Sequence, residues 1–288
     1  MLEKKPDAPA KFGALMAITD AEFEKLSTLI YRHFGIHLTE AKRGLLVRRL
    51  QNLLTSLEFK SFAEYYDHLV KHPSDAKFTE LVNRITTNYT FFNREPAHFE
   101  YFSEKALPEI INNHLSHNNR DLRIWCAAAS TGEEPYMLSI LMMEALGGNF
   151  GLWDSGILAT DISEKALTKA KIGRYNEDEF QNMPKHLKEK YFQKVSPGVF
   201  EVVQKVKSDV TFRRFNLINP TYPFKKPFDV IFCRNVMIYF DEETKVKVVH
   251  SLHKCLSPGG YLFIGHSESI MRHATLFKYV MPALYRKI

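Results

Sequence analysis

The chain has 288 residues, of which 45% are hydrophobic and 25% are charged, and its net charge is +6. This composition supports a buried core and excludes disorder over most of the length. No apolar run approaches the roughly 20 residues of a membrane span, and the polar N-terminus lacks the apolar core of a secretory signal. Three widely spaced cysteines argue against a disulfide framework and a zinc site. We therefore expect a soluble, cytoplasmic protein, with a monomer as the default. The cysteines are Cys126, Cys233 and Cys255.

The first part of the chain has the apolar spacing of helices. Residues 1–17 are rich in Pro, Ala and Lys and are expected to form a flexible tail. Thr19 followed three residues later by Glu22 is typical of a capping box, so we expect a helix to begin there. Apolar residues then recur at intervals of three and four, which predicts an all-helical domain over 18–93. Its further helices are expected at 39–54, around 62–69 and at 75–88.

The pattern changes to alternating strands and helices in the second part, 94–288. Strands and helices at this spacing indicate an α/β fold with a doubly wound parallel sheet. Between them, about 190–214, closely spaced valines suggest an inserted β-subdomain of short strands or a hairpin. The strands are expected at 122–127, 157–160, 228–233 and 261–265, and the helices at 135–146, 163–171 and 242–256.

Small and polar residues follow the first two expected strands, where an open α/β sheet binds its ligands. Gly132 permits backbone angles that a larger residue does not, although a tight turn without a ligand explains it equally well. Asp161 ends the second strand, where an acid accepts the hydroxyls of a ribose; a helix cap is the alternative. Glu133 and Glu134 would repel a pyrophosphate at the next helix start. The site therefore favours S-adenosylmethionine over NAD.

Five motifs in order resemble those of the CheR family, the chemotaxis-receptor glutamate methyltransferases. The resemblance extends over roughly residues 20–285. Of the five motifs, the first, second and fourth are long. The motifs are Thr-Thr-Asn-Tyr-Thr-Phe-Phe-Asn-Arg-Glu at 86–95, Ala-Ser-Thr-Gly-Glu-Glu-Pro-Tyr at 129–136, Asp161, Cys-Arg-Asn-Val-Met-Ile-Tyr-Phe at 233–240 and Gly-His-Ser-Glu-Ser at 265–269.

The resemblance implies a class I methyltransferase fold, Rossmann-like, with a small inserted β-subdomain and a preceding all-helical domain. It implies that S-adenosylmethionine is the methyl donor and S-adenosylhomocysteine the product. Arg94 and Tyr239 would line the methyl-transfer site as its catalytic residues, and 88–94 would close over the cofactor. The residues that would contact the cofactor are Asn88, Thr90, Arg94, Glu134, Asp161, Asn216, Leu217, Arg234 and Asn235.

The implied reaction needs no general base. A glutamate side chain has a pKa near 4.3, so the acceptor carboxylate is already ionised at neutral pH. The enzyme must align this carboxylate behind the methyl group and exclude water, which favours the separated charges. The product is a glutamate methyl ester on a chemoreceptor, used in sensory adaptation.

A basic stripe in the second helix is the candidate docking surface for the receptor, whose methylated region is an acidic helical bundle rich in Glu and Gln. Electrostatic steering by such a stripe is reasonable, but solvated charged faces are common. The stripe consists of Lys42, Arg43, Arg48 and Arg49. The short stretch 195–199 contains one glycine, which favours an enzyme independent of the C-terminal pentapeptide that tethers some members to receptors.

Two rival functions stay open. Asn-Pro-Thr-Tyr at 219–222 resembles a tetrapeptide of nitrogen methyltransferases, and residues 184–214 carry a local charge of +5 from eight Lys/Arg and three Asp/Glu, which suits nucleic acid. The tetrapeptide, however, precedes the strand that it should follow. A cofactor-binding signalling adaptor without turnover is the other rival. The histidine spacing predicts no metal site. His266 either braces the cleft or makes only a structural hydrogen bond, and the sequence leaves both open. Cys126 is expected to be buried, and the sequence offers no explanation for Asn93.

Overall fold

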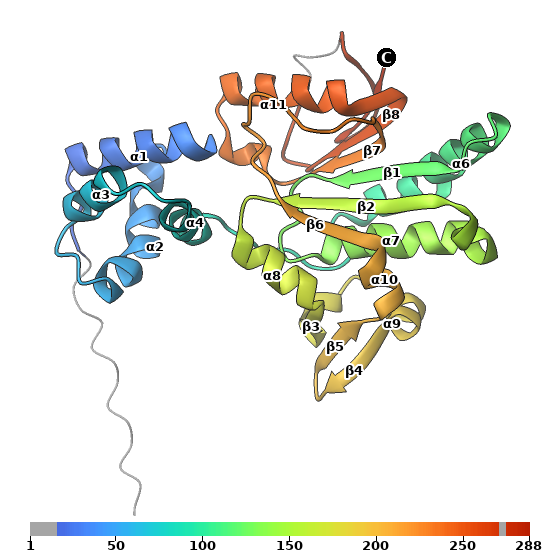
Figure 1. Ribbon diagram of the computed structural model, residues 1–288, viewed down its shortest axis with the longest axis horizontal. Helices are drawn as coiled ribbons and strands as arrows, with labels where there is room; N and C mark the ends of the chain where they lie inside the picture. Colours follow the sequence, from blue (N-terminus) through green and yellow to red (C-terminus); the bar gives the residue numbers. More distant parts are fainter. Residues whose placement is uncertain (1–15, 271–274) are drawn as a thin grey trace, which may run out of the picture. The chain divides into compact units, whose positions relative to one another are not determined.

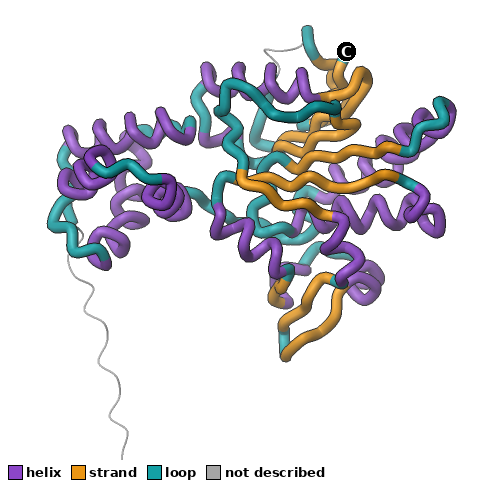
Figure 2. Tube along the Cα trace, viewed as in Figure 1, coloured by secondary structure: helices purple, strands orange, loops and turns teal. Residues whose placement is uncertain are grey.

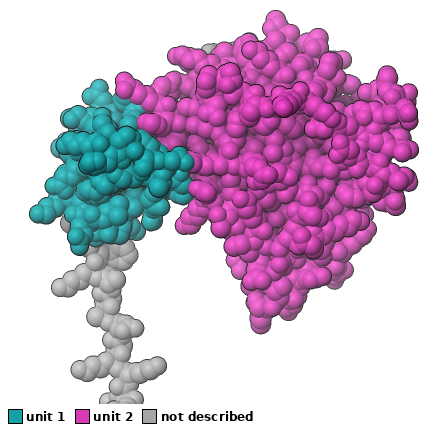
Figure 3. Space-filling view, viewed as in Figure 1, with its two compact units in different colours: residues 1–29, 38–85 teal, residues 30–37, 86–288 magenta. Residues whose placement is uncertain are grey.

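The computed structural model describes residues 16–270 and 275–288, and its chain divides into two units (Figure 3). Unit 1 contains the described residues up to Leu29 together with Leu38–Ile85. Unit 2 contains Ile30–His37 and Thr86–Ile288. The expected tail at 1–17 lies outside the described residues except for its last two. The unit boundary near residue 86 differs from the boundary at 93/94 expected from the sequence.

Unit 1 is helical, as the apolar spacing predicts. Helix α1 begins with the expected capping box, because the Thr19 amide donates to the Glu22 carboxylate at 2.8 Å and the Glu22 amide donates to the Thr19 hydroxyl at 3.3 Å. Buried leucines at helical spacing, among them Leu26, Leu46 and Leu50, form the core. The elements are α1 (Asp20–Phe34, whose last residues belong to unit 2), η1 (Glu40–Lys42), α2 (Arg43–Ser56), α3 (Phe62–Lys71) and α4 (Asp75–Ile85).

Unit 2 is built on a seven-stranded sheet with the order β6-β2-β1-β7-β8-β10-β9. Figure 1 shows the neighbouring strands from β6 to β8. The five strands from β6 to β8 run parallel, and β10 is antiparallel to both β8 and β9. The strand order reverses between β1 and β7, which is where open α/β sheets bind ligands. The strands are β1 (Asp121–Cys126), β2 (Asp154–Asp161), β6 (Val210–Arg214), β7 (Phe228–Cys233), β8 (Leu256–Ile264), β9 (Phe277–Met281) and β10 (Leu284–Lys287).

Helices cover both faces of this sheet. Alternate strand residues point to opposite faces, so Ile124 packs with one core and Trp125 with the other. The core around Ile124 contains residues of α6, α7 and α8, and the core around Trp125 contains residues of α11. The helices are α5 (Pro96–Tyr101), η2 (Phe102–Ala106), α6 (Leu107–Ser116), α7 (Glu133–Leu146), η3 (Gly147–Leu152), α8 (Glu164–Ile172), α10 (Gln204–Asp209), η5 (Met237–Tyr239) and α11 (Glu242–Cys255). The expected doubly wound α/β fold is confirmed.

A second, three-stranded antiparallel sheet is set apart from the main sheet (Figure 2). It contains β3 (Arg174–Asn176), β4 (Phe192–Ser196) and β5 (Val199–Val202), with η4 (Glu177–Phe180) and α9 (Lys185–Tyr191) between β3 and β4. The expected insert at 190–214 contains β4 and β5. It misses β3, and its last five residues form β6 of the main sheet, because Val210 and Phe212 are buried there.

The sequence patterns missed the helices between residues 96 and 116 and the C-terminal hairpin of β9 and β10. Phe99, Phe102 and Leu107 of these helices are buried in the core that also contains residues of β1, and η2 between α5 and α6 is a π-helix, which interrupts the α-helical period. Within the ranges 16–270 and 275–288, no helix has both the length and the apolar character needed to cross a membrane.

Candidate active site

The turn after β1 approaches the end of β2 closely. Ser130 and Gly132 both have positive φ angles, 47° and 101°. A side chain at Gly132 would place its Cβ 2.7 Å from the Tyr175 hydroxyl and 2.9 Å from the Ala170 Cβ. Glycine is therefore required here both by backbone conformation and by space.

Asp161 holds this turn in place. Its carboxylate accepts hydrogen bonds from the Ser130 amide and the Ser163 amide, both at 2.8 Å. Burial raises the pKa of Asp161 above its ordinary value, against the lowering effect of these backbone donors. Each carboxylate oxygen has a second lone pair, so Asp161 retains capacity for further donors. Ser163 caps α8 by accepting from the Ala166 amide, so Asp161 is not the helix cap.

A buried guanidinium joins three segments at the end of β7. The Arg234 side chain is 2% exposed and donates to the Glu134 carboxylate at 2.6 Å and to the Arg94 carbonyl oxygen at 2.6 Å. It also lies 2.9 Å from the Glu95 carboxylate. Cys126 donates to the other oxygen of Glu134 at 3.2 Å, and burial raises its pKa well above the ordinary value, so this thiol stays protonated.

Glu95 is a central acceptor that the sequence patterns did not reveal. Its carboxylate accepts from the Asn235 side-chain amide at 3.2 Å and from the His266 backbone amide at 3.3 Å, in addition to pairing with Arg234. Burial raises the pKa of Glu95, but the charge and hydrogen bonds of Arg234 outweigh it and hold the pKa below the ordinary value. Only its place in the 86–95 motif marked it.

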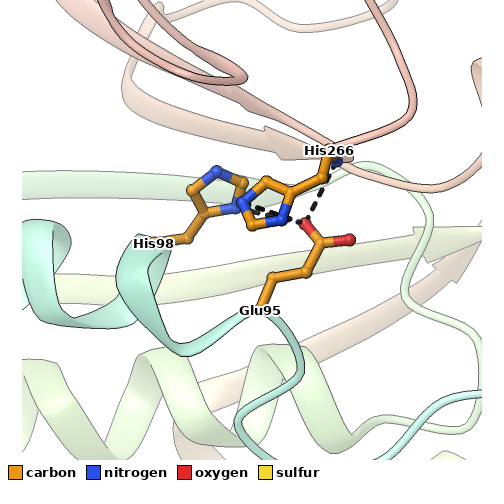
Figure 4. Close-up of side chains that lie close together, drawn as sticks. All are labelled: Glu95, His98 and His266. Atoms are coloured by element: carbon orange, nitrogen blue, oxygen red, sulfur yellow. Dashed lines mark hydrogen bonds and ion pairs between the residues drawn. The ribbon is translucent and has the colours of Figure 1, made fainter.

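Glu95, His98 and His266 point toward one another (Figure 4), with ligand atoms within 4.8 Å. This spacing meets the geometric minimum for a metal site. Glu95, however, already accepts from Arg234 and two other donors, and the guanidinium charge opposes a second cation nearby. The arrangement is therefore better suited to bracing the cleft than to binding metal. Burial, helped by the charge of Arg234, lowers the pKa of His98 to about 4, which keeps its ring neutral.

Glu268, from the last motif, fixes the backbone that carries Arg234 and Tyr239. Its carboxylate accepts from the amides of Asn235 at 3.0 Å, Gly265 at 2.6 Å and Ile238 at 3.2 Å. Asn235 has a φ angle of 57°, a conformation that asparagine tolerates better than most residues. Asn93 also has a positive φ, 59°, and its side chain donates to the Asn182 carbonyl oxygen, which accounts for an asparagine there.

These segments enclose a cavity of about 270 Å³ within unit 2. The structure brings all ten predicted catalytic and cofactor-contacting residues into its lining. They are Asn88, Thr90, Arg94, Glu134, Asp161, Asn216, Leu217, Arg234, Asn235 and Tyr239.

The lining residues differ in how far their polar atoms are already engaged in hydrogen bonds within the protein. The Asn216 side chain donates to the His33 carbonyl oxygen at 2.8 Å and accepts from the Ile218 amide at 3.2 Å, so both ends of its amide are engaged. Arg94 is half-buried and donates to the Tyr89 carbonyl oxygen at 2.9 Å. Sequence reasoning missed Phe34 and Ile36, which also line the cavity and come from a distant part of the chain.

The lining fits an adenosine carrying a positive charge better than a phosphate-bearing cofactor. Two carboxylates, Glu134 and Asp161, face the cavity, and Glu134 lies at the start of α7, where a phosphate would otherwise bind. The Ser130 hydroxyl is buried without a hydrogen-bond partner among the described residues, which leaves a polar group for a ligand to satisfy. Apolar walls from Ile162 and Leu217 suit an aromatic base.

Comparison with known families decides the class. The model described as CheR methyltransferase, SAM binding domain, matches residues 88–285, and that of the CheR methyltransferase all-alpha domain matches residues 21–86. The chain belongs to the CheR methyltransferase family. This membership confirms the expected class I methyltransferase fold with its helical N-terminal domain, the cofactor S-adenosylmethionine, and the enzyme class of protein-glutamate O-methyltransferase.

Relatives in the CheR family align with nearly the whole chain. A chemotaxis protein methyltransferase of Borreliella burgdorferi is 41% identical, over 96% of this chain and 98% of its own. Chemotaxis protein methyltransferase 2 of Pseudomonas aeruginosa is 37% identical over 93% of each chain. The chemotaxis protein methyltransferase of Escherichia coli is 36% identical, over 88% of this chain and 86% of its own.

Glu133 departs from the expectation that both acids at the start of α7 face the ligand. It is fully buried, lies outside the cavity lining, and accepts from the Thr131 hydroxyl at 2.9 and 2.7 Å. Burial raises the pKa of Glu133 to about 7, although the Thr131 hydroxyl opposes this shift. Glu134 alone of the pair therefore acts on the cavity.

The pKa of Glu133 predicts a pH-dependent loss of stability. In an unfolded chain this carboxyl group ionises near pH 4.3, whereas in the folded protein it ionises near pH 7. The free energy of unfolding therefore falls as the pH rises through this window. In the wild type, ionisation of Glu133 should lower the free energy of unfolding by up to about 3 kcal/mol between pH 5 and 8. We expect Glu133→Gln, whose amide oxygen still accepts from Thr131, to abolish this decrease.

Urea unfolding of both proteins at pH 5 and pH 8 measures this difference. Glu104→Gln, an exposed position, is the matched control and should follow the wild type. Equal pH dependence in the wild type and Glu133→Gln would show that Glu133 ionises normally.

Proposed function

We propose that this enzyme transfers a methyl group from S-adenosylmethionine to glutamate side chains of chemoreceptors, forming the methyl esters used in sensory adaptation. The observation that carries the proposal is that Arg94 and Tyr239 line the same cavity as Asp161 and Glu134. A group that binds anions and a group that donates hydrogen bonds therefore lie beside the proposed cofactor site. The cytoplasm is the proposed location, and the acidic helical bundle of a receptor is the proposed partner.

The cofactor would be held by the lining residues. When bound, S-adenosylmethionine supplies an electrophilic methyl group on a positively charged sulfur. Asp161 accepts from the ribose hydroxyls, and Glu134, fixed by Arg234, provides negative charge for a cationic ligand. Leu217 provides an apolar wall, while Asn88, Thr90, Asn216 and Asn235 contribute polar groups.

Arg94 and Tyr239 would position the acceptor carboxylate. One of the Arg94 donors is engaged by the Tyr89 carbonyl oxygen, which fixes the guanidinium and leaves its remaining donors for a carboxylate. Tyr239 lies in η5, whose backbone Glu268 holds through the Ile238 amide. Since the acceptor is already ionised, these residues serve to align it and to replace its water shell.

Only part of the basic stripe is proposed as a receptor-docking surface. Arg43 pairs with Asp20 at 2.7 Å and Glu40 at 2.6 Å, and Arg49 donates to the Ile85 carbonyl oxygen, so both have structural roles in unit 1. Lys42 is half-exposed and Arg48 is exposed on α2. Of the four, Arg48 is the best placed to meet an acidic partner.

We further propose that the enzyme does not need a receptor pentapeptide. Only Pro197 and Gly198 separate β4 from β5, and Gly198 has a φ angle of 71°, which gives a tight turn. This turn presents little backbone to a tethering peptide. We also propose the functional division expected from the sequence, with 18–93 as the helical domain and 94–288, including the β-subdomain, as the methyltransferase domain.

The nitrogen-methyltransferase alternative finds little support. The tetrapeptide 219–222 is not part of the cavity lining. Its Tyr222 hydroxyl donates to the Leu217 carbonyl oxygen at 2.6 Å, and its ring contacts that of Trp125. The segment therefore serves packing beside β1.

Transfer of tritiated methyl from S-adenosylmethionine to receptor-containing membranes, followed by base treatment, tests the function. We expect volatile label, because glutamate methyl esters release methanol in base whereas N-methyl groups do not. Tyr239→Phe should lower the single-turnover rate about 10- to 100-fold, since it loses a hydrogen bond to a charged group.

The affinity of Tyr239→Phe for S-adenosylhomocysteine should stay within about twofold of the wild type, by the same reasoning that places Tyr239 at the acceptor. Tyr279→Phe, at an exposed position outside the cavity lining, is the matched control. Base-stable label would favour a nitrogen acceptor, and cofactor binding without any transfer would favour the adaptor.

Reversal of charge at Arg48 tests docking. Arg48→Glu should raise the KM for receptor about fivefold or more at low salt, with a smaller effect at high salt, because screening weakens steering. Lys60→Glu changes the charge equally at another exposed position of unit 1 and should have less effect. An unchanged KM for Arg48→Glu would reject this surface.

Titration with a receptor C-terminal pentapeptide tests the absence of a tether. We expect no saturable binding by calorimetry, and equal methylation of receptors with and without the pentapeptide. Saturable binding that β4–β5 turn substitutions abolish would contradict the proposal.

A further inference from the structure

Two large apolar residues are exposed at the opening of the cavity. Tyr89 is 68% exposed and Ile238 is 43% exposed, yet both contribute to the cavity lining. Single exposed apolar residues are ordinary on a protein surface, but two at one opening are informative. The other large apolar residues that are exposed in the described ranges lie outside this lining; they are Leu57, Val70, Leu115, Leu152, Ile172, Val195, Tyr279 and Ile288.

Each of the two adjoins one of the residues proposed to position the acceptor carboxylate. The Tyr89 carbonyl oxygen accepts from the Arg94 guanidinium at 2.9 Å, and the Tyr89 ring contacts the Phe91 ring edge-on, with centroids 5.9 Å apart. Ile238 directly precedes Tyr239 in η5, and its amide donates to Glu268 at 3.2 Å. Both apolar side chains are thus carried by backbone that is fixed relative to the transfer site.

The chemistry of methyl transfer indicates a role for Tyr89 and Ile238. A carboxylate attacking a positively charged sulfonium group loses charge in the transition state, so water at the opening slows the step. Tyr89 and Ile238 present exposed apolar side chains beside the transfer site. An acceptor protein that packs against them would exclude water from the opening.

We propose that Tyr89 and Ile238 form an apolar collar that receives the receptor helix bearing the target glutamate. This inference rests on the proposed function. Residues three and four positions apart lie beside one another on a helix, so a glutamate entering the cavity brings its neighbours one turn away against the collar. Arg94 attracts the carboxylate, and the collar selects small or apolar neighbours. Tyr89 and Ile238 are thereby specificity-determining residues, distinct from the basic stripe of η1 and α2.

Kinetics with a soluble fragment of the receptor helical bundle tests the collar. We expect Tyr89→Ala to lower kcat/KM for the fragment about 10-fold, as truncation of a buried interface anchor does, and Ile238→Ser to lower it by a smaller factor. Tyr89→Phe, which keeps the ring, should recover most of the loss. Tyr279→Ala removes an equally exposed ring away from the cavity and should leave kcat/KM within about twofold of the wild type.

Substitution in the fragment provides a second measurement. Of two fragments designed with alanine or aspartate one turn from the target glutamate, the aspartate fragment should have a much lower kcat/KM with the wild-type enzyme. The difference should be smaller with Tyr89→Ala, because the collar that rejects the charge is gone. Coupling of this kind is not produced by a fold defect. The affinity of each variant for S-adenosylhomocysteine, measured by calorimetry, separates the collar from a cofactor wall.

The outcomes are distinct. A wild-type enzyme that places no base-labile methyl on the fragment overturns the proposed function, and the collar with it. An active wild type with Tyr89→Ala at full kcat/KM overturns the collar alone. A parallel loss of S-adenosylhomocysteine affinity in Tyr89→Ala assigns the residue to the cofactor, which also overturns it.

Discussion

The buried guanidinium of Arg234 is the interaction on which the site depends. A charge taken out of water is costly unless it is paired and hydrogen-bonded, and this side chain is 2% exposed. Glu95 and Glu134 supply the opposite charges, and the Arg94 carbonyl oxygen accepts a further hydrogen bond. These partners come from separate segments. The end of β7, the start of α7 and residues 94–95 must therefore lie together for the charge of Arg234 to be paired. The positions of Arg94 and Glu134 at the cavity thus follow from an electrostatic requirement.

Backbone strain is concentrated at the same place. Among the described residues, the non-glycine positions with positive φ include Asn93, Glu95, Ser130 and Asn235, all of which lie at or beside the cavity. Such conformations cost on the order of 1–3 kcal/mol each and persist only where neighbouring bonds over-determine them. Asp161 holds Ser130, and Glu268 holds Asn235, through their backbone amides. The carboxylates therefore fix the shape of the cavity before any ligand enters, which lowers the entropy that binding must overcome.

What the sequence predicts well is what short-range physics determines. The capping box at Thr19 and the strand that ends at Asp161 depend on near neighbours, and each is present. The sequence also marks Gly132 as a turn residue, but the lack of space for a side chain there depends on the distant Tyr175 and Ala170. The residues that escaped prediction depend on distant ones. Phe34 and Ile36 reach the cavity from the N-terminal part of the chain, and β3 pairs with β5 although η4, α9 and β4 lie between them in sequence. The Arg49 side chain donates to the Ile85 carbonyl oxygen. The alternating apolar pattern contains no signal for such pairings. Asn88, Thr90, Asn216 and Leu217 were identified through the family resemblance, since periodicity marks none of them.

Helix α1 is continuous from Asp20 to Phe34, yet its residues are divided between the two units. The chain enters unit 2 at Ile30, leaves it after His37 and returns at Thr86. During synthesis the N-terminal part emerges first. Ile218 and Phe240, against which Gly35 packs, are added only when most of the chain has been made. The C-terminal end of α1 therefore reaches its final packing only after the C-terminal half of the chain has been synthesised. A fragment cut near residue 86 would have the converse defect, because it would lack Phe34 and Ile36 from its cavity wall.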